Sequence, residues 1–426
     1  MSFSIVFFLI FFCFYCVKAD HLIVLVHGFL GSPTDLEYLG EQLTKLGNCR
    51  VLYSQSNFWI KSLAGIEDGA QRLVDEIQIA QQNHPNLRQI SFVGNSLGGL
   101  YARFATHLMT AHLRLNGNCT NNVTESSDCK YLYANSNALG FEPISFLTVA
   151  SPFLGVSDYT YLDDLVQHIA GAESAKIPVT VKKMIASIMG STGKELFLFD
   201  DKDKTQTLLY RMNTAEEYLA PLRLFKRRRL YANLDNDFMV SAYTGAFLAP
   251  ETIIFLQERE RQSRTTTPSS KKEASVADLP RIVANITTSP NLHCSISTNE
   301  SQANAQTVES FGQGLSAAAD SSNSPPEAAD PKQAVYSRMR DKLDCLGWEK
   351  VIVYFPGNLP LAHNRIAALR KFPTFISRML GFDQGNFVMD HAAEFLSRGE
   401  HSAAQTASCT VEICSQYPET ALVNDA

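Results

Sequence analysis

Short apolar runs alternate with amphipathic stretches along most of the chain. The run His21–Val26 (HLIVLV) has strand length and no polar break after its first residue, which is typical of a strand buried in a parallel sheet. The stretch from 36 to 46 then repeats leucine at intervals of three or four residues, which predicts an amphipathic helix. Strands alternating with such helices predict an α/β fold, with a mostly parallel central sheet and helices on both faces. The same pattern predicts further strands at 50–53, 89–93, 144–149, 229–231 and 350–355, and helices through 66–77 and 101–108.

Two stretches depart from this alternation, and the first is the uncharged run from Phe3 to Val17. It is shorter than the roughly 20 apolar residues that span a bilayer, and Val17-Lys18-Ala19 has the small residues of a signal-peptide cleavage site. We therefore expect residues 1–19 to be a signal peptide that directs the chain to the secretory pathway or outside the cell. The alternatives are an uncleaved membrane anchor, a buried strand, or a misassigned start of an intracellular protein. Four N-x-[ST] sequons fit the first interpretation, at Asn118, Asn122, Asn285 and Asn299.

The second stretch, 257–334, is rich in Ser, Thr, Ala, Asn, Gln and Pro and contains one aromatic residue, Phe311. Such a segment cannot bury enough apolar surface to offset its chain entropy, so we expect a disordered insertion. The folded part is then 20–256 together with 335–400, followed by a C-terminal tail at 401–426.

A helical pattern also fills 178–224, between two of the predicted strands. An insertion at that point would lie over the carboxyl edge of the sheet. We therefore expect a helical cap at about 157–225.

The overall composition excludes several functional classes. The chain has 426 residues, 43 acidic and 37 basic side chains, a net charge of −6 and a pI of about 6.0. Such a chain has no electrostatic basis for binding nucleic acid, because that binding depends on neutralising phosphates. Apolar residues at 45% and charged residues at 19% are ordinary for a soluble globular protein.

Nine cysteines bear on the compartment and on metal binding. Cys13 and Cys16 would leave with the signal peptide, and the remaining seven are odd in number, so at least one is unpaired or intermolecular. No Cys or His cluster has the spacing of a zinc site, so we expect no metal. The expected disulfides are Cys119 with Cys129 and Cys409 with Cys414.

The first chemical motif is Gly94-Asn95-Ser96-Leu97-Gly98, which follows an apolar strand and precedes an amphipathic helix. In this G-x-S-x-G pattern the glycines allow a sharp turn from strand to helix, so that Ser96 presents its hydroxyl above the sheet. The strand and helix on either side favour a nucleophile elbow over a structural turn. Ser96 is therefore the candidate nucleophile.

The second motif, His27-Gly28-Phe29-Leu30-Gly31, comes directly after the first predicted strand. Acyl transfer needs fixed N–H groups for the oxyanion of its tetrahedral intermediate. In this layout the residue after the nucleophile, Leu97, supplies one N–H, and Phe29 or Leu30 supplies the other. His27 comes too early in the chain to be the base, so we expect it to hold its loop by a hydrogen bond.

A nucleophilic serine also needs a base and an acid, which follow in the chain order Ser, Asp or Glu, His in α/β-hydrolases. The loop after strand 229–231 offers Asp235 and Asp237 as the acid. The loop after strand 350–355 offers His363 as the base. A second candidate base is His391, although a polar position on a terminal helix explains that residue equally well.

Six segments in order resemble the lipase or serine-esterase family of eukaryotic α/β-hydrolases, whose yeast relatives act on neutral lipids. They extend from His21 to about Leu396 and are interrupted by 257–334. The resemblance implies Asp237 as the acid and His363 as the base. The family usually has His at the positions of Asn95 and Phe153. The segments are HLIVLVHGFLGSPTDLEYL, GNSLGGLYARF, FLTVASPFLGV, GKELFLFDDKDKTQTLLYRM, LFKRRRLYANLDNDFMV and WEKVIVYFPGNLPLAHNRI.

The resemblance implies an α/β-hydrolase fold and a lipase-like serine esterase that needs no cofactor. The implied substrate is a lipid acyl ester, and the implied partner is a lipid surface or membrane contacted peripherally, not a nucleic acid. An acyltransferase or thioesterase with the same three residues is the nearer alternative. A catalytically silent lipid-binding or scaffold protein is the more distant one. Four apolar residues near the site could line an acyl pocket or simply pack in the core, namely Phe29, Leu30, Phe153 and Leu154.

Overall fold

The structure is a computed structural model, and it describes most of the chain outside the ends and a few internal segments. The signal-peptide prediction for 1–19 and the predicted pairings of Cys119 with Cys129 and Cys409 with Cys414 lie outside the described residues. Among the residues described, no helix combines the length and the apolar character needed to cross a bilayer. The described ranges are 20–47, 49–116, 140–158, 177–265, 279–290, 331–357, 359–371, 373–397 and 410–412.

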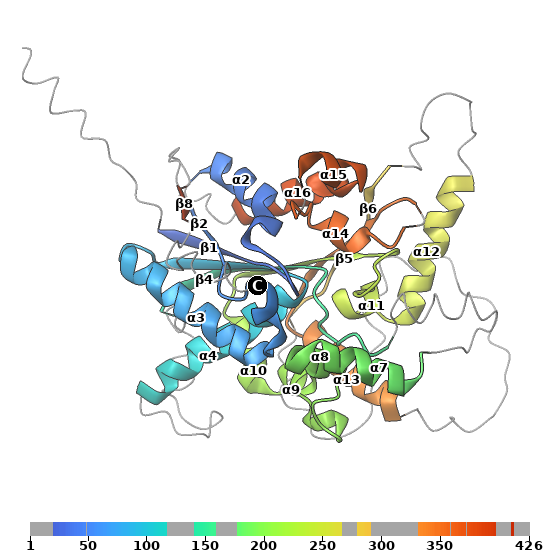
Figure 1. The fold of residues 1–426 in the computed structure, drawn as a ribbon, viewed down its shortest axis with the longest axis horizontal. Coiled ribbons are helices and arrows are strands. Elements are labelled where there is room, and N and C mark those ends of the chain that lie inside the picture. Colours follow the sequence, from blue (N-terminus) through green and yellow to red (C-terminus); the bar gives the residue numbers. More distant parts are fainter. Residues whose placement is uncertain are drawn as a thin grey trace, which may run out of the picture.

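One eight-stranded sheet forms the centre of the described structure (Figure 1). All neighbouring strands are parallel except β6 and β7, which are antiparallel. All six strands expected from the apolar runs are present, with ends that differ by no more than two residues. In the order in which they lie side by side, the strands are β6 (Arg281–Thr287), β7 (Glu349–Tyr354), β5 (Arg227–Asn233), β4 (Glu142–Val149), β3 (Gln89–Asn95), β1 (His21–Val26), β2 (Cys49–Tyr53) and β8 (Thr410–Glu412).

Helices cover both faces of this sheet (Figure 1). One face carries α2 (Glu37–Leu46), α14 (Ala362–Ile366), α15 (Thr374–Met379) and α16 (Asn386–Ser397). The other carries α3 (Ile66–Asn83), α4 (Leu97–Asn116), α8 (Gly190–Leu196), α9 (Leu208–Thr214), α10 (Glu216–Arg223) and α13 (Pro331–Asp344). The remaining α-helices are α7 (Val179–Ile188), α11 (Ala242–Gly245) and α12 (Pro250–Thr265), and the short 3₁₀ helices are η1 (Pro33–Leu36), η2 (Trp59–Leu63), η3 (Lys204–Gln206) and η6 (Phe382–Gly385).

Strand β1 shows why the central strands lack polar residues. Leu22, Val24 and Val26 pack into the hydrophobic core under α3 and α4. Ile23 and Leu25 pack into the second core, under α2 and α16. Because successive side chains point to opposite faces, a strand between two helical layers needs apolar residues at every position. This arrangement confirms the predicted α/β fold.

The structure corrects part of the predicted insertion at 257–334. Helix α12 continues to Thr265, and Arg281–Thr287 forms strand β6 at the edge of the sheet. β6 is only half-buried and lies within a polar stretch, so the average composition hid its short β-branched pattern (RIVANIT). The predicted tail at 401–426 likewise contains strand β8, which pairs with β2.

Among the described residues between β4 and β5, where the sequence predicts a cap, there are four α-helices, α7 to α10. They divide into two parts. α10 packs on α4 within the layer that covers the sheet. Side chains of α7, together with Ile177, Met189 and Phe197, line the cavity that contains Ser96, so this described part of the insertion borders the site.

Two cysteines that the sequence did not single out, Cys49 and Cys345, are disulfide-bonded. Cys49 begins β2, and Cys345 follows α13 directly. Neither belongs to the two pairings expected from sequence spacing.

Candidate active site

Ser96 lies on a sharp turn between β3 and α4. Its φ angle is 52°, in the left-handed region that non-glycine residues seldom adopt. Its backbone N–H donates to the Val149 carbonyl at 2.8 Å, which ties the turn to the neighbouring strand. A Cβ on Gly98 would lie 2.1 Å from the Val26 carbonyl oxygen, so only glycine permits the helix to begin this close to β1. A parallel sheet covered by helices, with this strand–serine–helix turn, is the α/β-hydrolase fold.

The loop after β1 lies against the serine. A Cβ on Gly28 would lie 2.8 Å from the Ser96 Cβ, so this loop approaches the turn as closely as backbone can. His27 is buried, and its Nδ1–H donates to the Gly28 carbonyl at 3.0 Å. Burial lowers the pKa of His27, so the ring is neutral and holds the loop.

The structure corrects one of the predicted oxyanion donors. The Leu30 N–H donates to the Ser62 Oγ at 2.9 Å, so this N–H is already used within the fold. Ser62 in turn donates to the Trp59 carbonyl at 2.7 Å, which fixes its hydroxyl as the acceptor. Phe29 and Leu97 remain as the candidate donors, because Phe29 lies in the loop beside Ser96 and Leu97 begins α4.

Asp237 and His363 come together from the loops after β5 and β7. His363 Nδ1 lies 3.0 Å from Asp237 Oδ2, and both residues are buried. The same carboxylate accepts hydrogen bonds from three further donors, which are Asn233 Nδ2 at 2.7 Å, Met239 N at 3.0 Å and Val240 N at 2.8 Å. Four donors around a buried carboxylate hold it in one orientation.

A backbone bridge joins the two loops. Asp237 pairs with Leu361 in an isolated antiparallel bridge, and the Ala362 N–H donates to the Asn236 carbonyl at 3.1 Å. Asn236 also donates from its side chain to the Gly357 carbonyl at 2.8 Å. These bonds bring the start of α14, and with it His363, against Asp237.

The other candidate acid, Asp235, makes a hydrogen bond to a different element. Its Oδ1 accepts a hydrogen bond from Gln257 Nε2 of α12 at 2.6 Å. Asp235 is therefore bonded to α12, and it does not line the cavity that contains Ser96.

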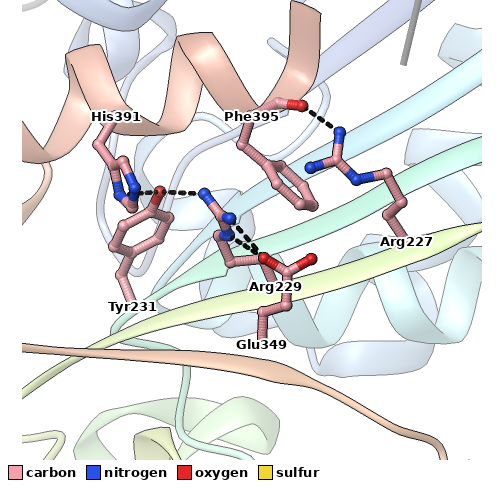
Figure 2. A network of polar contacts seen from close by, with 6 residues as sticks. All are labelled: Arg227, Arg229, Tyr231, Glu349, His391 and Phe395. Carbon is pink, nitrogen blue, oxygen red and sulfur yellow. Dashed lines mark hydrogen bonds and ion pairs between the residues drawn. The ribbon is translucent and has the colours of Figure 1, made fainter. Parts of the chain in front are cut away.

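The other candidate base, His391, lies on α16 over the sheet. Figure 2 shows its ring beside Tyr231, with Nδ1 at 3.1 Å from the Tyr231 hydroxyl. Tyr231 also contacts Arg229, which pairs with Glu349 of β7. Because His391 belongs to this network and does not line the Ser96 cavity, the structure does not bring it together with Ser96.

Ser96 and His363 line one cavity of about 460 Å³, which we call the Ser96 cavity. Most of its wall is apolar. The apolar lining residues are Phe29, Leu30, Val156, Ile177, Ile185, Met189, Phe197, Phe238, Met239 and Leu369, and the other polar ones are Asp35, Asn95, Lys182, Asn364 and Lys371. A concave apolar site with few polar groups is typical of a pocket for an apolar ligand.

Of the four apolar residues considered for an acyl pocket, Phe29 and Leu30 line this cavity. Phe153 and Leu154 do not, and both are buried in the core. The Phe153 ring packs edge-on against Phe247 at 5.5 Å. Asn95, the other position where the family usually has His, does line the cavity.

Two polar residues of the site were missed by the sequence reasoning. Asn233 holds the Asp237 carboxylate, and Ser62 accepts from the loop beside Ser96. Asn233 could have been found, because it follows the predicted strand at 229–231 and precedes the two candidate acids. Ser62 carries no such signal, since it is 34 residues from Ser96 and only the folded chain brings the two segments together.

Comparison with known proteins places the chain in a family. Residues 17–250 match a family described as "Putative serine esterase (DUF676)". Two proteins of Saccharomyces cerevisiae are each 30% identical to this chain, "Putative lipase YDL109C" over 59% of it and "Putative lipase ROG1" over 54% of it. The matched segments make up 33% and 29% of these relatives' own lengths, so this chain corresponds to about a third of each.

Solved structures with partial similarity include two bacterial enzymes. The lipase BlEst2 of Bacillus licheniformis in its propeptide form is 15% identical, with a TM-score of 0.31 over 64% of this chain and 57% of that one. Phospholipase PlaB of Legionella pneumophila is 15% identical, with a TM-score of 0.28 over 53% of this chain and 42% of that one. Because the family match covers more than half of its length, the chain belongs to the family described as putative serine esterases.

Proposed function

We propose that this chain is a serine hydrolase that cleaves the carboxylic esters of lipids through Ser96, His363 and Asp237. The observation that carries the proposal is the hydrogen bond between His363 and Asp237, at the same cavity into which the strained Ser96 turn opens. Membership of a serine-esterase family supports the reaction class. The names of the yeast relatives support lipids as the substrate class.

In the proposed mechanism, the Ser96 Oγ attacks the ester carbonyl carbon while His363 Nε2 accepts the hydroxyl proton. Asp237 accepts the Nδ1–H of His363, which keeps Nε2 free to act as the base and stabilises the ring once it is protonated. The negative charge moves to the carbonyl oxygen, where the N–H groups of Phe29 and Leu97 stabilise it. The carbon–oxygen bond to the alcohol then breaks, and His363 returns the proton to the leaving alcohol.

Water completes the cycle. His363 takes a proton from the water as its oxygen attacks the acyl-enzyme. The bond to Ser96 then breaks to release a carboxylic acid, and His363 returns the proton to Ser96 Oγ. No cofactor takes part in these steps.

The apolar wall of the Ser96 cavity supports an acyl chain as the occupant. Burying a methylene group in such a wall contributes about 0.8 kcal/mol. We therefore expect catalytic efficiency to increase with acyl-chain length until the cavity is full.

A fluorophosphonate probe tests the nucleophile. We expect it to label the full chain but not Ser96→Ala, while Ser56→Ala, which changes another buried serine outside the cavity, stays labelled. A folded wild-type protein that does not label would overturn the proposal and favour a silent lipid-binding protein.

Hydrolysis of an ester panel tests the substrate class. We expect long-chain acyl esters to be cleaved with a higher kcat/KM than short-chain esters, with free fatty acid as the product. Preference for thioesters, or a new ester as the main product when an acceptor alcohol is added, would replace the lipase with a thioesterase or an acyltransferase.

We also propose that the protein folds in the secretory pathway or functions outside the cell. The disulfide bonds at Cys49 and Cys345 support this, because cytosolic thiols are normally kept reduced. The sequon residue Asn285 is exposed on the edge strand β6, as attachment of a glycan requires. We expect glycosidase treatment of the cell-derived protein to increase its mobility, with a smaller change for Asn285→Gln. An unglycosylated protein with free thiols at both cysteines would contradict the proposal.

A further inference from the structure

Large apolar side chains are exposed on three segments around the Ser96 cavity. They lie on η2 with the residue before it, on the outer face of α7, and on α15. Several are more exposed than most polar residues, at 73% for Ile188, 72% for Phe375 and 76% for Met379. We call this set the apolar rim, and its main members are Trp59, Ile60, Met184, Ile188, Phe375 and Met379.

One of these segments, α7, contributes to the wall of the cavity, and so does a residue just before α15. Ile185 of α7 lines the cavity, while its neighbour Met184 points into solvent. Lys371 lines the cavity three residues before α15 begins. α7 and α15 lie on opposite sides of the sheet (Figure 1), and the cavity wall includes side chains of α7 and Lys371 of the segment before α15.

The third segment is bonded directly to the loop beside Ser96. The Trp59 N–H donates to the Gly31 carbonyl at 3.1 Å, and Ser62 accepts from the Leu30 N–H. Trp59 has a φ of 53°, a strained conformation for a bulky residue, and half of its surface is exposed. A tryptophan kept exposed at the cost of backbone strain is a mark of a contact surface.

The charges on these segments have one sign, although the chain as a whole is acidic. The sequences 58–64, 179–188 and 371–379 contain no Asp or Glu. Their exposed cations are Lys61, Lys183, Lys371 and Arg378. Apolar and aromatic side chains on segments that carry cations and no carboxylates of their own fit an anionic lipid surface, into which the apolar groups insert while the cations contact head groups.

We propose that the apolar rim binds the surface of an anionic phospholipid bilayer, with the Ser96 cavity opening toward the lipid. Binding to the bilayer requires no catalysis, so it does not depend on the proposed function. Only the delivery of a lipid to Ser96 rests on the proposed function. A lipid could then pass from the bilayer into the cavity without crossing water.

Sedimentation with vesicles tests the proposal. The full chain carrying Ser96→Ala is mixed with vesicles of phosphatidylcholine, or of phosphatidylcholine with about one third phosphatidylserine, so that no lipid is hydrolysed. We expect binding to the anionic vesicles to be tighter by about fivefold or more for each cation that reaches the surface, and to weaken as salt is raised. Failure to bind the anionic vesicles would overturn the proposal.

Paired substitutions then locate the surface. Met184→Ser with Ile188→Ser, or Phe375→Ser with Met379→Ser, should each weaken binding by about tenfold or more, because two inserted side chains are lost. The matched control is Ile254→Ser with Phe255→Ser on α12, which removes two side chains that are 54% and 57% exposed but do not line the Ser96 cavity. All variants keep the same N-terminal sequence, so any contribution of that segment cancels.

The outcomes separate this proposal from the proposed function. If the control weakens binding as much as the rim variants do, or if the rim variants bind normally, the rim is not the lipid contact. If the rim variants only convert a dimer to a monomer, the partner is a second copy of the chain. Hydrolysis of a short soluble ester by otherwise wild-type rim variants should be unchanged. A loss of all hydrolysis with vesicle binding intact would overturn the proposed function alone.

Discussion

Replacing Asp237 with Asn tests the proposed acid by changing one atom. Oδ2 of the carboxylate accepts hydrogen bonds from His363 and Asn233, and Oδ1 accepts them from the N–H groups of Met239 and Val240. An asparagine oxygen can stay at the Oδ1 position and keep both backbone hydrogen bonds. Its NH₂ group then replaces Oδ2, where both partners are donors.

This substitution changes the tautomer of His363. The new NH₂ group can only donate to Nδ1, which leaves the proton on Nε2, the nitrogen that must accept the proton of Ser96. The same exchange in a serine protease lowers kcat by about 10⁴. We therefore expect Asp237→Asn to lower kcat/KM by about 10³ to 10⁴, or about 4 to 5.5 kcal/mol of transition-state stabilisation.

The free energy of unfolding should change much less. Asn233 Oδ1 is buried without a hydrogen-bond partner, so a flip of this side-chain amide turns an acceptor toward the new NH₂ group. The loss is then limited to about 1 to 3 kcal/mol, for the interactions that the flip does not restore. The activity loss thus exceeds what partial unfolding of the protein could produce.

The assay combines the rate of fluorophosphonate labelling with hydrolysis of a soluble ester and a denaturant melt of each protein. The matched control is Asp235→Asn, which changes the hydrogen bond to Gln257 and leaves His363 untouched. Retention of more than about a tenth of wild-type activity by Asp237→Asn would refute this reasoning. An equal loss in Asp235→Asn would do the same.

Three further tests concern the base, the loop after β1 and a buried carboxyl group. His363→Ala should abolish fluorophosphonate labelling. His391→Ala should leave the labelling rate within about twofold, because His391 does not line the Ser96 cavity. The reverse result would reassign the base. Gly28→Ala should lower kcat at least about tenfold in a folded protein, because the new Cβ would lie 2.8 Å from the Ser96 Cβ. A normal kcat would show that the loop after β1 can move away from Ser96. Burial raises the pKa of Glu195 from 4.5 to about 7, so the folded state binds the proton more tightly and stability falls as pH rises between these values. Glu195→Gln should therefore stabilise the protein by about 1 to 3 kcal/mol at pH 8 and have little effect at pH 4, as measured by denaturant melts, and an equal effect at both pH values would contradict the assignment.

How closely a strand can be predicted from the sequence depends on how deeply the strand is buried. The strands β1 and β3 were predicted within two residues because both of their faces are buried, which demands continuous apolar runs. The edge strands β6 and β8 were missed, since β6 is only half-buried, β8 has three residues, and both lie within polar stretches. The disulfide-bonded residues Cys49 and Cys345 were missed for a related reason, because spacing along the chain says little about distance in the fold.

The sequence by itself determined the α/β alternation, the Ser96 turn and a short set of candidate acids and bases, because these depend on local periodicity and on glycine at the turn. Only the tertiary structure decided which carboxylate faces which imidazole. The bridge between Asp237 and Leu361 joins two loops more than a hundred residues apart and leaves Asp235 and His391 in other networks. The Leu30 N–H likewise donates its hydrogen bond to Ser62, a residue distant in the chain, and is therefore not a candidate oxyanion donor. Hydrogen bonds between distant segments depend on the packing of the whole sheet, and no local pattern records them.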